Sequence, residues 1–187
     1  HPLQSPMKKL LAAIAATVLS LSSAFAQSVP SPTIAAKSWL LLDATSNQIL
    51  ASSEPDMRIE PASLTKLMTA YVAFTAVQDK KLDLNQMITI STNAWKVDPS
   101  SSKMFIEPRV PVKVNDLLYG LIVQSGNDAA VAIAEAVAGT EDAFVALMNR
   151  EAERMGMKST HFANPHGLPS ASNYSTCLLY TSPSPRD

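Results

Sequence analysis

Pro61-Ala-Ser-Leu-Thr-Lys-Leu-Met-Thr69 decides the fold, because it opens a long apolar run that continues to Val77. Within this stretch Ser63 precedes Lys66 by three positions, and residues three apart lie on the same face of a helix. The lysine amine can then approach the serine hydroxyl to within hydrogen-bond distance. A hydroxyl beside an amine is the arrangement of a nucleophile and its base, so the spacing indicates nucleophilic chemistry.

The same pair has a simpler explanation, because Ser-x-x-Lys is a permissive pattern and serine is a preferred N-cap residue. On that interpretation Ser63 only caps the helix and Lys66 is solvated. The helix is apolar on most of its faces, however, which is typical of a central helix. Burial disfavours a charged lysine, so Lys66 becomes a candidate base. We also expect the Ser63 N–H, at the positive end of the helix, to form half of an oxyanion hole.

Composition excludes several functional classes. The 187 residues are 47% hydrophobic with a net charge of −1, which suits one globular domain and gives no basic stripe for nucleic acid. Cys177 is the single cysteine, so an internal disulfide framework and a Cys-rich metal site are excluded. His161 and His166 lack the spacing of a catalytic zinc site and are interpreted as structural or loop histidines. We therefore expect no catalytic zinc site.

The N-terminal segment has the pattern of an export signal. Residues 7–26 comprise a start methionine with two lysines, an apolar run and the small-residue pattern Ala24-Phe-Ala26, which predicts a mature protein beginning at Gln27. An uncleaved anchor is the alternative, but the apolar run is short for a bilayer. Residues 1–6 are interpreted as an upstream scar, and residues 27–36 as a lead-in.

The remaining pattern predicts a hairpin followed by helices. Polar turn residues at 44–47 separate two apolar strands, and glycine or Ser-Gly breaks separate the later helices. We see no internal repeat. The predicted elements are strands over 37–43 and 48–52, a helix from 63, short irregular or β segments over 82–91, a loop over 98–103, and helices over 114–124, 128–138 and 141–155.

A second polar motif, Ser125-Gly-Asn127, falls in the turn between two of these helices. Serine, glycine and asparagine are usual helix breakers, so a turn explains the tripeptide by itself. Glycine lets the backbone bend there and leaves the flanking polar side chains free to project. In combination with Ser63 and Lys66, Ser125 and Asn127 become candidate site residues.

Residues 37–176 resemble a low-molecular-mass penicillin-binding protein of the D-alanyl-D-alanine carboxypeptidase family. Pro61 to Thr69 resembles the family's first motif and its flanks, and Leu121-Ile-Val-Gln-Ser-Gly-Asn-Asp-Ala-Ala130 resembles the second. Residues 142–149 and 160–168 resemble segments that lie between the second and third motifs. The resemblance implies an α/β fold of the α+β type, similar to β-lactamases and transpeptidases, with an antiparallel sheet packed by helices and a helical subdomain.

The resemblance also implies a reaction that uses no metal and no organic cofactor. Ser63 would attack the terminal D-Ala-D-Ala bond of a peptidoglycan pentapeptide, and Lys66 would take its proton. Ser125 would relay a proton to the leaving D-alanine, and Asn127 would hold the substrate amide and orient Lys66. Water would then hydrolyse the acyl-enzyme, whereas β-lactam antibiotics would acylate the same serine as covalent inhibitors.

Two alternatives remain open. A class A-like β-lactamase shares the first motif, but its second motif usually has aspartate where Gly126 stands, and no segment resembles its loop with a catalytic glutamate. A non-catalytic homologue that binds penicillin or the cell wall is the other alternative. Measurement of D-alanine release would distinguish it from an enzyme.

The end of the chain departs from the family. Residues 177–187 are interpreted as an artefactual tail, and the family's third motif, Lys-Thr/Ser-Gly, does not occur in the sequence, because Lys158-Ser-Thr160 is no substitute. We therefore expect an incomplete sheet with an exposed hairpin edge, and an inactive fragment of an active full-length protein. Membrane association is expected only through a C-terminal anchor outside this chain. The full-length protein is expected to be exported to the periplasm and peripheral on the inner membrane.

Overall fold

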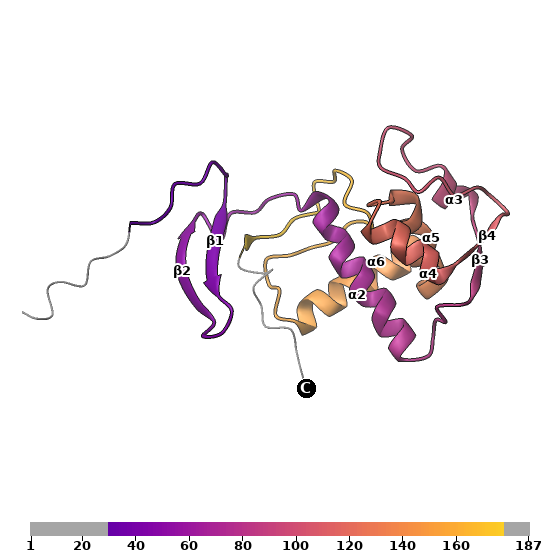
Figure 1. The fold of residues 1–187 in the computed structure, drawn as a ribbon, viewed down its shortest axis with the longest axis horizontal. Helices are drawn as coiled ribbons and strands as arrows, with labels where there is room; N and C mark the ends of the chain where they lie inside the picture. Colours follow the sequence, from indigo (N-terminus) through magenta and orange to yellow (C-terminus); the bar gives the residue numbers. More distant parts are fainter. Residues whose placement is uncertain (1–29, 178–187) are drawn as a thin grey trace, which may run out of the picture. The chain divides into compact units, whose positions relative to one another are not determined.

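The computed structural model describes residues 30–177, and the helices and strands of these described residues belong to the unit Ala36–Asp187 (Figure 1). The predicted scar, the export signal and the tail beyond Cys177 lie outside the described residues. Within residues 30–177, no helix has both the length and the apolar character needed to cross a membrane.

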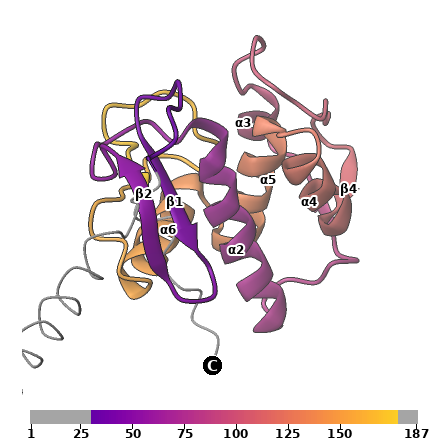
Figure 2. The same cartoon turned by 60° about the vertical axis from the view of Figure 1, so that its left-hand side comes forward.

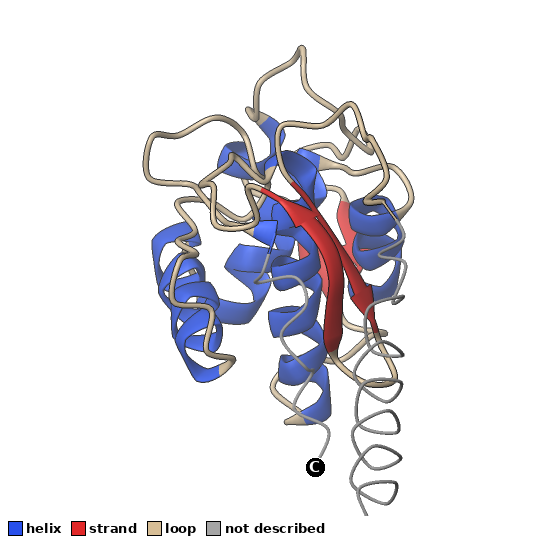
Figure 3. Ribbon diagram, turned by 90° about the vertical axis from the view of Figure 1, so that its left-hand side faces the viewer, coloured by secondary structure: helices blue, strands red, loops and turns tan. Residues whose placement is uncertain are grey.

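The predicted hairpin is confirmed. Strand β1 (Trp39–Asp43) pairs antiparallel with β2 (Gln48–Ser53), and together they form a two-stranded sheet. The Asp43 carboxylate fixes the turn, because it accepts hydrogen bonds from the Thr45 N–H at 2.9 Å and the Ser46 hydroxyl at 2.8 Å. The strands of this hairpin leave several apolar side chains exposed, namely Leu41, Ile49 and Leu50. Figure 3 shows the twisted hairpin as the longest strands of a largely helical unit.

Helix α2 (Thr65–Gln78) is the central helix, as its apolar sequence predicts. It packs against α4 (Val114–Ile122), α5 (Asn127–Ala138) and α6 (Glu141–Arg154). It runs between α6 and the α4–α5 pair (Figure 2). One face stays open, since Leu67 and Phe74 are exposed. The helix starts two residues later than predicted, because a 3₁₀ turn, η2 (Ala62–Leu64), carries Ser63.

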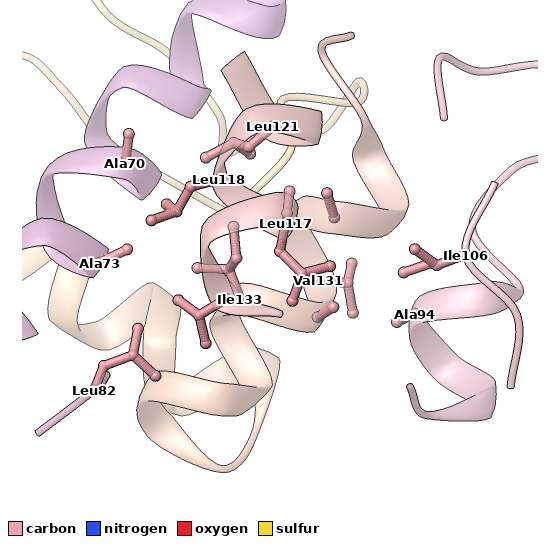
Figure 4. Packing of buried hydrophobic residues seen from close by; sticks show 14 of the residues in the cluster. Ala70, Ala73, Leu82, Ala94, Ile106, Leu117, Leu118, Leu121, Val131 and Ile133 are labelled. Atoms are coloured by element: carbon pink, nitrogen blue, oxygen red, sulfur yellow. The ribbon is translucent and has the colours of Figure 1, made fainter. Parts of the chain in front are cut away.

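The main core lies where α4 and α5 meet α2. Leu117, Leu121, Val131 and Ile133 interdigitate there, and Ala73 of α2 faces them (Figure 4). Helix α5 is buried along most of its length because alanines occupy many of its positions and allow neighbouring helices to approach closely. The three predicted helices over 114–124, 128–138 and 141–155 are confirmed with ends shifted by one or two residues.

A second small sheet was only partly predicted. Strand β3 (Met87–Thr89) falls in the segment for which short β structure is expected, but its partner β4 (Pro111–Lys113) and helix α3 (Thr92–Trp95) were missed. Elements of three or four residues are too short to show a period. The start of α3 is fixed by a cap, because the Ala94 N–H donates to the Ser91 hydroxyl at 3.0 Å.

Candidate active site

Ser63 does not act as a helix cap. The cap position of α2 is Leu64, and the cap of η2 is Pro61, and neither makes a side-chain capping bond. The N-cap explanation of Ser63 is therefore wrong. Its hydroxyl instead accepts from the Lys66 Nζ at 3.5 Å, the outer limit of a hydrogen bond. The predicted contact between the two side chains is confirmed.

The Lys66 amine is buried and has a second, shorter contact. Only 6% of the residue is exposed, and its Nζ donates to the backbone carbonyl of His166 at 2.7 Å. Burial lowers the pKa of Lys66 from its usual 10.5 to about 8. A large fraction of the amine is therefore neutral near pH 8, and one of its N–H bonds is held away from Ser63. In its neutral form the amine has a lone pair that can accept the Ser63 hydroxyl proton across the 3.5 Å contact.

The loop over 163–168 holds that carbonyl in place. Thr69 of α2 donates its hydroxyl to the Pro165 carbonyl at 2.6 Å, and the Asn164 side chain accepts from the Gly167 N–H at 2.6 Å. Gly167 has φ +86, and a Cβ at this position would lie 1.8 Å from the Ala62 carbonyl oxygen. The loop thus packs directly on the turn that carries the candidate nucleophile, and only glycine fits at the contact.

His166 is a loop histidine, as interpreted from the sequence, but its backbone also enters the site. Its Nδ1 accepts from the Leu168 N–H at 3.1 Å, so a neutral ring carries its proton on Nε2, which lies 3.6 Å from the Glu141 carboxylate. Burial, together with the charge of Lys66, lowers the pKa of His166 to about 4. The ring is neutral at physiological pH and serves to fix the loop.

Ser125 adopts a strained backbone conformation in the turn between α4 and α5. Its φ is +55, and its hydroxyl is buried without a hydrogen-bond partner. Glycine does not provide the bend, as the sequence suggested, because Gly126 has φ −64. Gly126 is required for space instead: a Cβ there would lie 3.0 Å from an Asp128 carboxylate oxygen and 3.2 Å from the Met104 nitrogen.

Asn127 begins α5 and is 5% exposed. Its N–H donates to the Ser102 carbonyl at 2.8 Å, and the Ser102 hydroxyl donates to the Gln124 carbonyl at 2.6 Å. The loop over 98–106 is thereby attached to the second motif. Because α5 packs against α2, the two motifs lie on contacting helices.

Sequence reasoning missed a buried carboxylate next to Asn127. Asp128 is 1% exposed, and its oxygens accept four backbone N–H groups, from Met104 at 3.0 Å, Phe105 at 2.9 Å, Ile106 at 3.2 Å and Ala129 at 2.9 Å. An acidic residue in the first turn of a helix was the available signal. Among residues 30–177, no group of three or more His, Cys, Asp or Glu side chains is placed to hold a metal ion.

Comparison with known proteins agrees with these motifs. The family model described as D-alanyl-D-alanine carboxypeptidase, peptidase family S11, matches residues 24–179. The chain belongs to this family. A curated relative, D-alanyl-D-alanine carboxypeptidase DacC of Escherichia coli, is 40% identical over 178 residues, which cover 92% of this chain and 44% of DacC. The chain therefore spans less than half the length of this carboxypeptidase.

Solved carboxypeptidases and penicillin-binding proteins share the fold. Penicillin-binding protein 5 of Haemophilus influenzae aligns with a TM-score of 0.78 and 42% identity, over 82% of this chain and 46% of that protein. Penicillin-binding protein D2 of Listeria monocytogenes, solved in a cefotaxime-bound form, aligns with a TM-score of 0.71 and 27% identity, over 81% of this chain and 63% of that protein. The expected β-lactamase/transpeptidase-like fold is confirmed, and this chain covers part of that fold.

Proposed function

We propose that this chain carries the nucleophile and base of a serine-type D-Ala-D-Ala carboxypeptidase, which removes the terminal D-alanine of peptidoglycan stem peptides. The observation that carries the proposal is the buried Lys66 amine, held by the His166 carbonyl and directed at the Ser63 hydroxyl. Membership of the carboxypeptidase family supports the substrate class.

In the first step, the Ser63 Oγ attacks the carbonyl carbon of the penultimate D-alanine while the neutral Lys66 amine accepts the hydroxyl proton. The pKa of about 8 makes the neutral amine available near neutral pH without making it a weak base. The charge that develops on the substrate carbonyl oxygen is stabilised by the Ser63 N–H, in the 3₁₀ turn that precedes α2.

In the second step, Ser125 donates its hydroxyl proton to the nitrogen of the leaving D-alanine and regains a proton from the Lys66 ammonium. The C–N bond breaks, and the acyl group stays on Ser63 as an ester. A buried hydroxyl without a partner costs about 1–3 kcal/mol, and a bound substrate would supply the missing partner. Asn127 holds the substrate amide, and water then hydrolyses the ester.

The same chemistry makes β-lactam antibiotics covalent inhibitors, because their strained amide presents an equivalent carbonyl to Ser63. The cefotaxime-bound form of the Listeria relative supports this proposal. Export to the periplasm is supported by the signal pattern of residues 7–26 and by a substrate that lies outside the cytoplasm. A peripheral position on the inner membrane remains a prediction.

The chain alone is expected to turn over poorly. The 187 residues contain no Lys-Thr-Gly or Lys-Ser-Gly segment, the motif whose strand faces the nucleophile in the family. Losing one oxyanion donor costs about a hundredfold or more in turnover. Activity is therefore best measured in a chimera in which residues 30–176 replace the matching segment of DacC. We call this protein the DacC chimera.

A class A-like β-lactamase is disfavoured by the crowding at Gly126. Such enzymes usually have aspartate at this position, and here even a Cβ would approach Asp128 and the Met104 nitrogen closely. Measurement of released D-alanine distinguishes the enzyme from a non-catalytic, penicillin-binding homologue.

The test is covalent labelling combined with release of D-alanine. The DacC chimera is incubated with a fluorescent penicillin and with a D-Ala-D-Ala pentapeptide, and the labelled residue is located by peptide mass. We expect saturable labelling at Ser63, release of free D-alanine, and loss of both in Ser63→Ala but not in the exposed control Ser53→Ala. Labelling without D-alanine release would support the non-catalytic homologue. D-alanine release by Ser63→Ala would contradict the nucleophile assignment.

A further inference from the structure

The loop after α3 carries an aromatic and basic surface that the proposed acyl transfer does not use. Trp95 and Phe105 are 47% and 80% exposed and line one hollow of about 170 Å³. An adjoining hollow of about 400 Å³ is lined by Trp95, Lys96 and Lys103. We call Trp95, Lys96, Lys103 and Phe105 the platform. Large apolar side chains exposed beside a hollow are typical of a binding surface.

Phe105 is held outward by a strained backbone. Its φ is +63, a region that bulky L residues rarely adopt. The Asp128 carboxylate enforces this conformation, because it binds the N–H groups of Phe105 and of both its neighbours. Ile106 is buried and points inward beside Ala94 (Figure 4). Strain that is enforced by the surrounding structure and turns an aromatic ring into solvent is characteristic of a functional position.

The loop that carries part of the platform is attached to the second motif of the candidate active site. This loop carries Lys103 and Phe105, and also Ser102, whose carbonyl accepts the Asn127 N–H at 2.8 Å. The Ser102 hydroxyl donates to the Gln124 carbonyl, next to Ser125. This loop and the second motif are therefore held together by direct hydrogen bonds.

We propose that the platform binds the glycan strand of peptidoglycan. The proposal rests on the proposed function, because a stem peptide bound at Ser63 is attached to such a strand. Sugar rings present flat C–H faces that pack on exposed aromatic rings, and Trp95 and Phe105 provide two. The stem peptides that branch from the strand carry carboxylates, which complement the ammonium groups of Lys96 and Lys103.

Acidic groups near the platform leave this complementarity in place. The Asp98 carboxylate is bound within its own loop, because it accepts hydrogen bonds from the Ser100 hydroxyl at 2.7 Å and the Ser100 N–H at 2.9 Å. These hydrogen bonds lower the pKa of Asp98, and its electrostatic interaction with Lys103 also contributes to lowering it. Glu107 and Asp128 line the smaller hollow, and the Asp128 carboxylate is bound by four backbone N–H groups. The larger hollow is lined by two lysines and no carboxylate.

The experiment uses the 187-residue chain with Trp39→Phe. The chain has two tryptophans, so this substitution leaves only Trp95. Its fluorescence is titrated with soluble glycan strands freed of stem peptides, and separately with free stem pentapeptide. We expect the glycan to change Trp95 emission saturably, and Phe105→Ala to weaken its binding at least tenfold. Phe74→Ala is the control, because Phe74 on α2 is another exposed phenylalanine, at 47% against 80% for Phe105, and lies outside the platform.

A second variant separates binding from folding. Phe105→Gly removes the ring but relieves the strain at positive φ, so we expect a higher unfolding midpoint together with the same loss of glycan binding. Glycan that still carries stem peptides should bind more tightly than bare glycan, and Lys96→Ala with Lys103→Ala should reduce that difference.

Unchanged glycan affinity in both Phe105 variants would overturn the proposal. So would a Trp95 response to the free pentapeptide but not to bare glycan, or a response that depends only on protein concentration and so indicates a second copy of the chain. Penicillin labelling of the DacC chimera reports separately on the acyl transfer. Penicillin labelling without glycan binding would contradict the proposed role of the platform but not the acyl transfer. Glycan binding without labelling would contradict the proposed acyl transfer but not the platform.

Discussion

The Lys66 amine and the Ser125 hydroxyl are both buried polar groups of the candidate site, but their surroundings differ. Lys66 is held by two oxygens, from Ser63 and His166, whereas Ser125 has no partner and a strained backbone. One group is organised before any substrate binds, and the other is left unsatisfied until one does. The difference matches a base that must be positioned and a proton donor that must meet a leaving group.

Removal of the base should have the largest effect. In the DacC chimera, we expect Lys66→Met to slow penicillin labelling by about a thousandfold, because a positioned general base contributes this much to such a step. The exposed control is Lys37→Met, which should label at the original rate. A labelling rate within tenfold of the unchanged chimera would mean that another group takes the Ser63 proton.

Displacement of the His166 loop should have the next largest effect. In the 187-residue chain, Gly167→Ala places a Cβ against the Ala62 carbonyl and should lower the free energy of unfolding by about 3 kcal/mol, measured with urea. Gly156→Ala is the matched control: its φ is +75, but a Cβ there meets nothing within 4 Å, so it should cost about 1 kcal/mol. Equal costs would show that the loop does not press on the nucleophile's turn.

Removal of the unpaired hydroxyl should lower turnover without lowering stability. We expect Ser125→Ala to reduce D-alanine release by the DacC chimera about a hundredfold, whereas the free energy of unfolding of the chain should stay the same or rise, because an unpartnered buried hydroxyl is removed. Ser102→Ala, which loses a 2.6 Å bond to the Gln124 carbonyl, should destabilise by about 1 kcal/mol. A stability loss in Ser125→Ala greater than that in Ser102→Ala would reveal a partner for the Ser125 hydroxyl.

The pH dependence should be the smallest effect. The pKa of Lys66 is about 8 in the folded chain against a usual 10.5, so between these values the unfolded chain binds more protons and the native state gains stability as pH rises. Below pH 8 this contribution is flat. Labelling of the chimera should likewise rise with pH up to about 8. The free energy of unfolding of Lys66→Met, measured with urea, should not rise between about pH 8 and 10.5. If it still rises, the gain in stability belongs to another group.

Features that depend on near neighbours in the sequence were predictable. The Ser63–Lys66 contact follows from helical spacing. The lowered pKa of Lys66 follows from its burial in an apolar helix. The hairpin and the longer helices follow from periodicity and turn residues. The prediction that Ser63 faces a base therefore needed only local information.

Features set by packing were not predictable. The His166 carbonyl meets Lys66 across 100 positions, and no local pattern encodes a backbone acceptor at that distance. The positive φ belongs to Ser125 rather than Gly126, and the glycine stands where Asp128 and Met104 leave little room for a Cβ. Strand β4 and the four N–H groups at Asp128 likewise depend on contacts made only in the folded chain.

The four N–H groups at Asp128 also have a consequence for local opening. Three of them belong to consecutive residues of a surface loop, and they are tied to the buried first turn of α5 rather than to a strand or helix of their own. Their exchange with deuterated water should therefore require α5 to move, so the amides of 104–106 should be as slow to exchange as those of the helix. A loop with an exposed aromatic ring would then share the cooperative unfolding of the core.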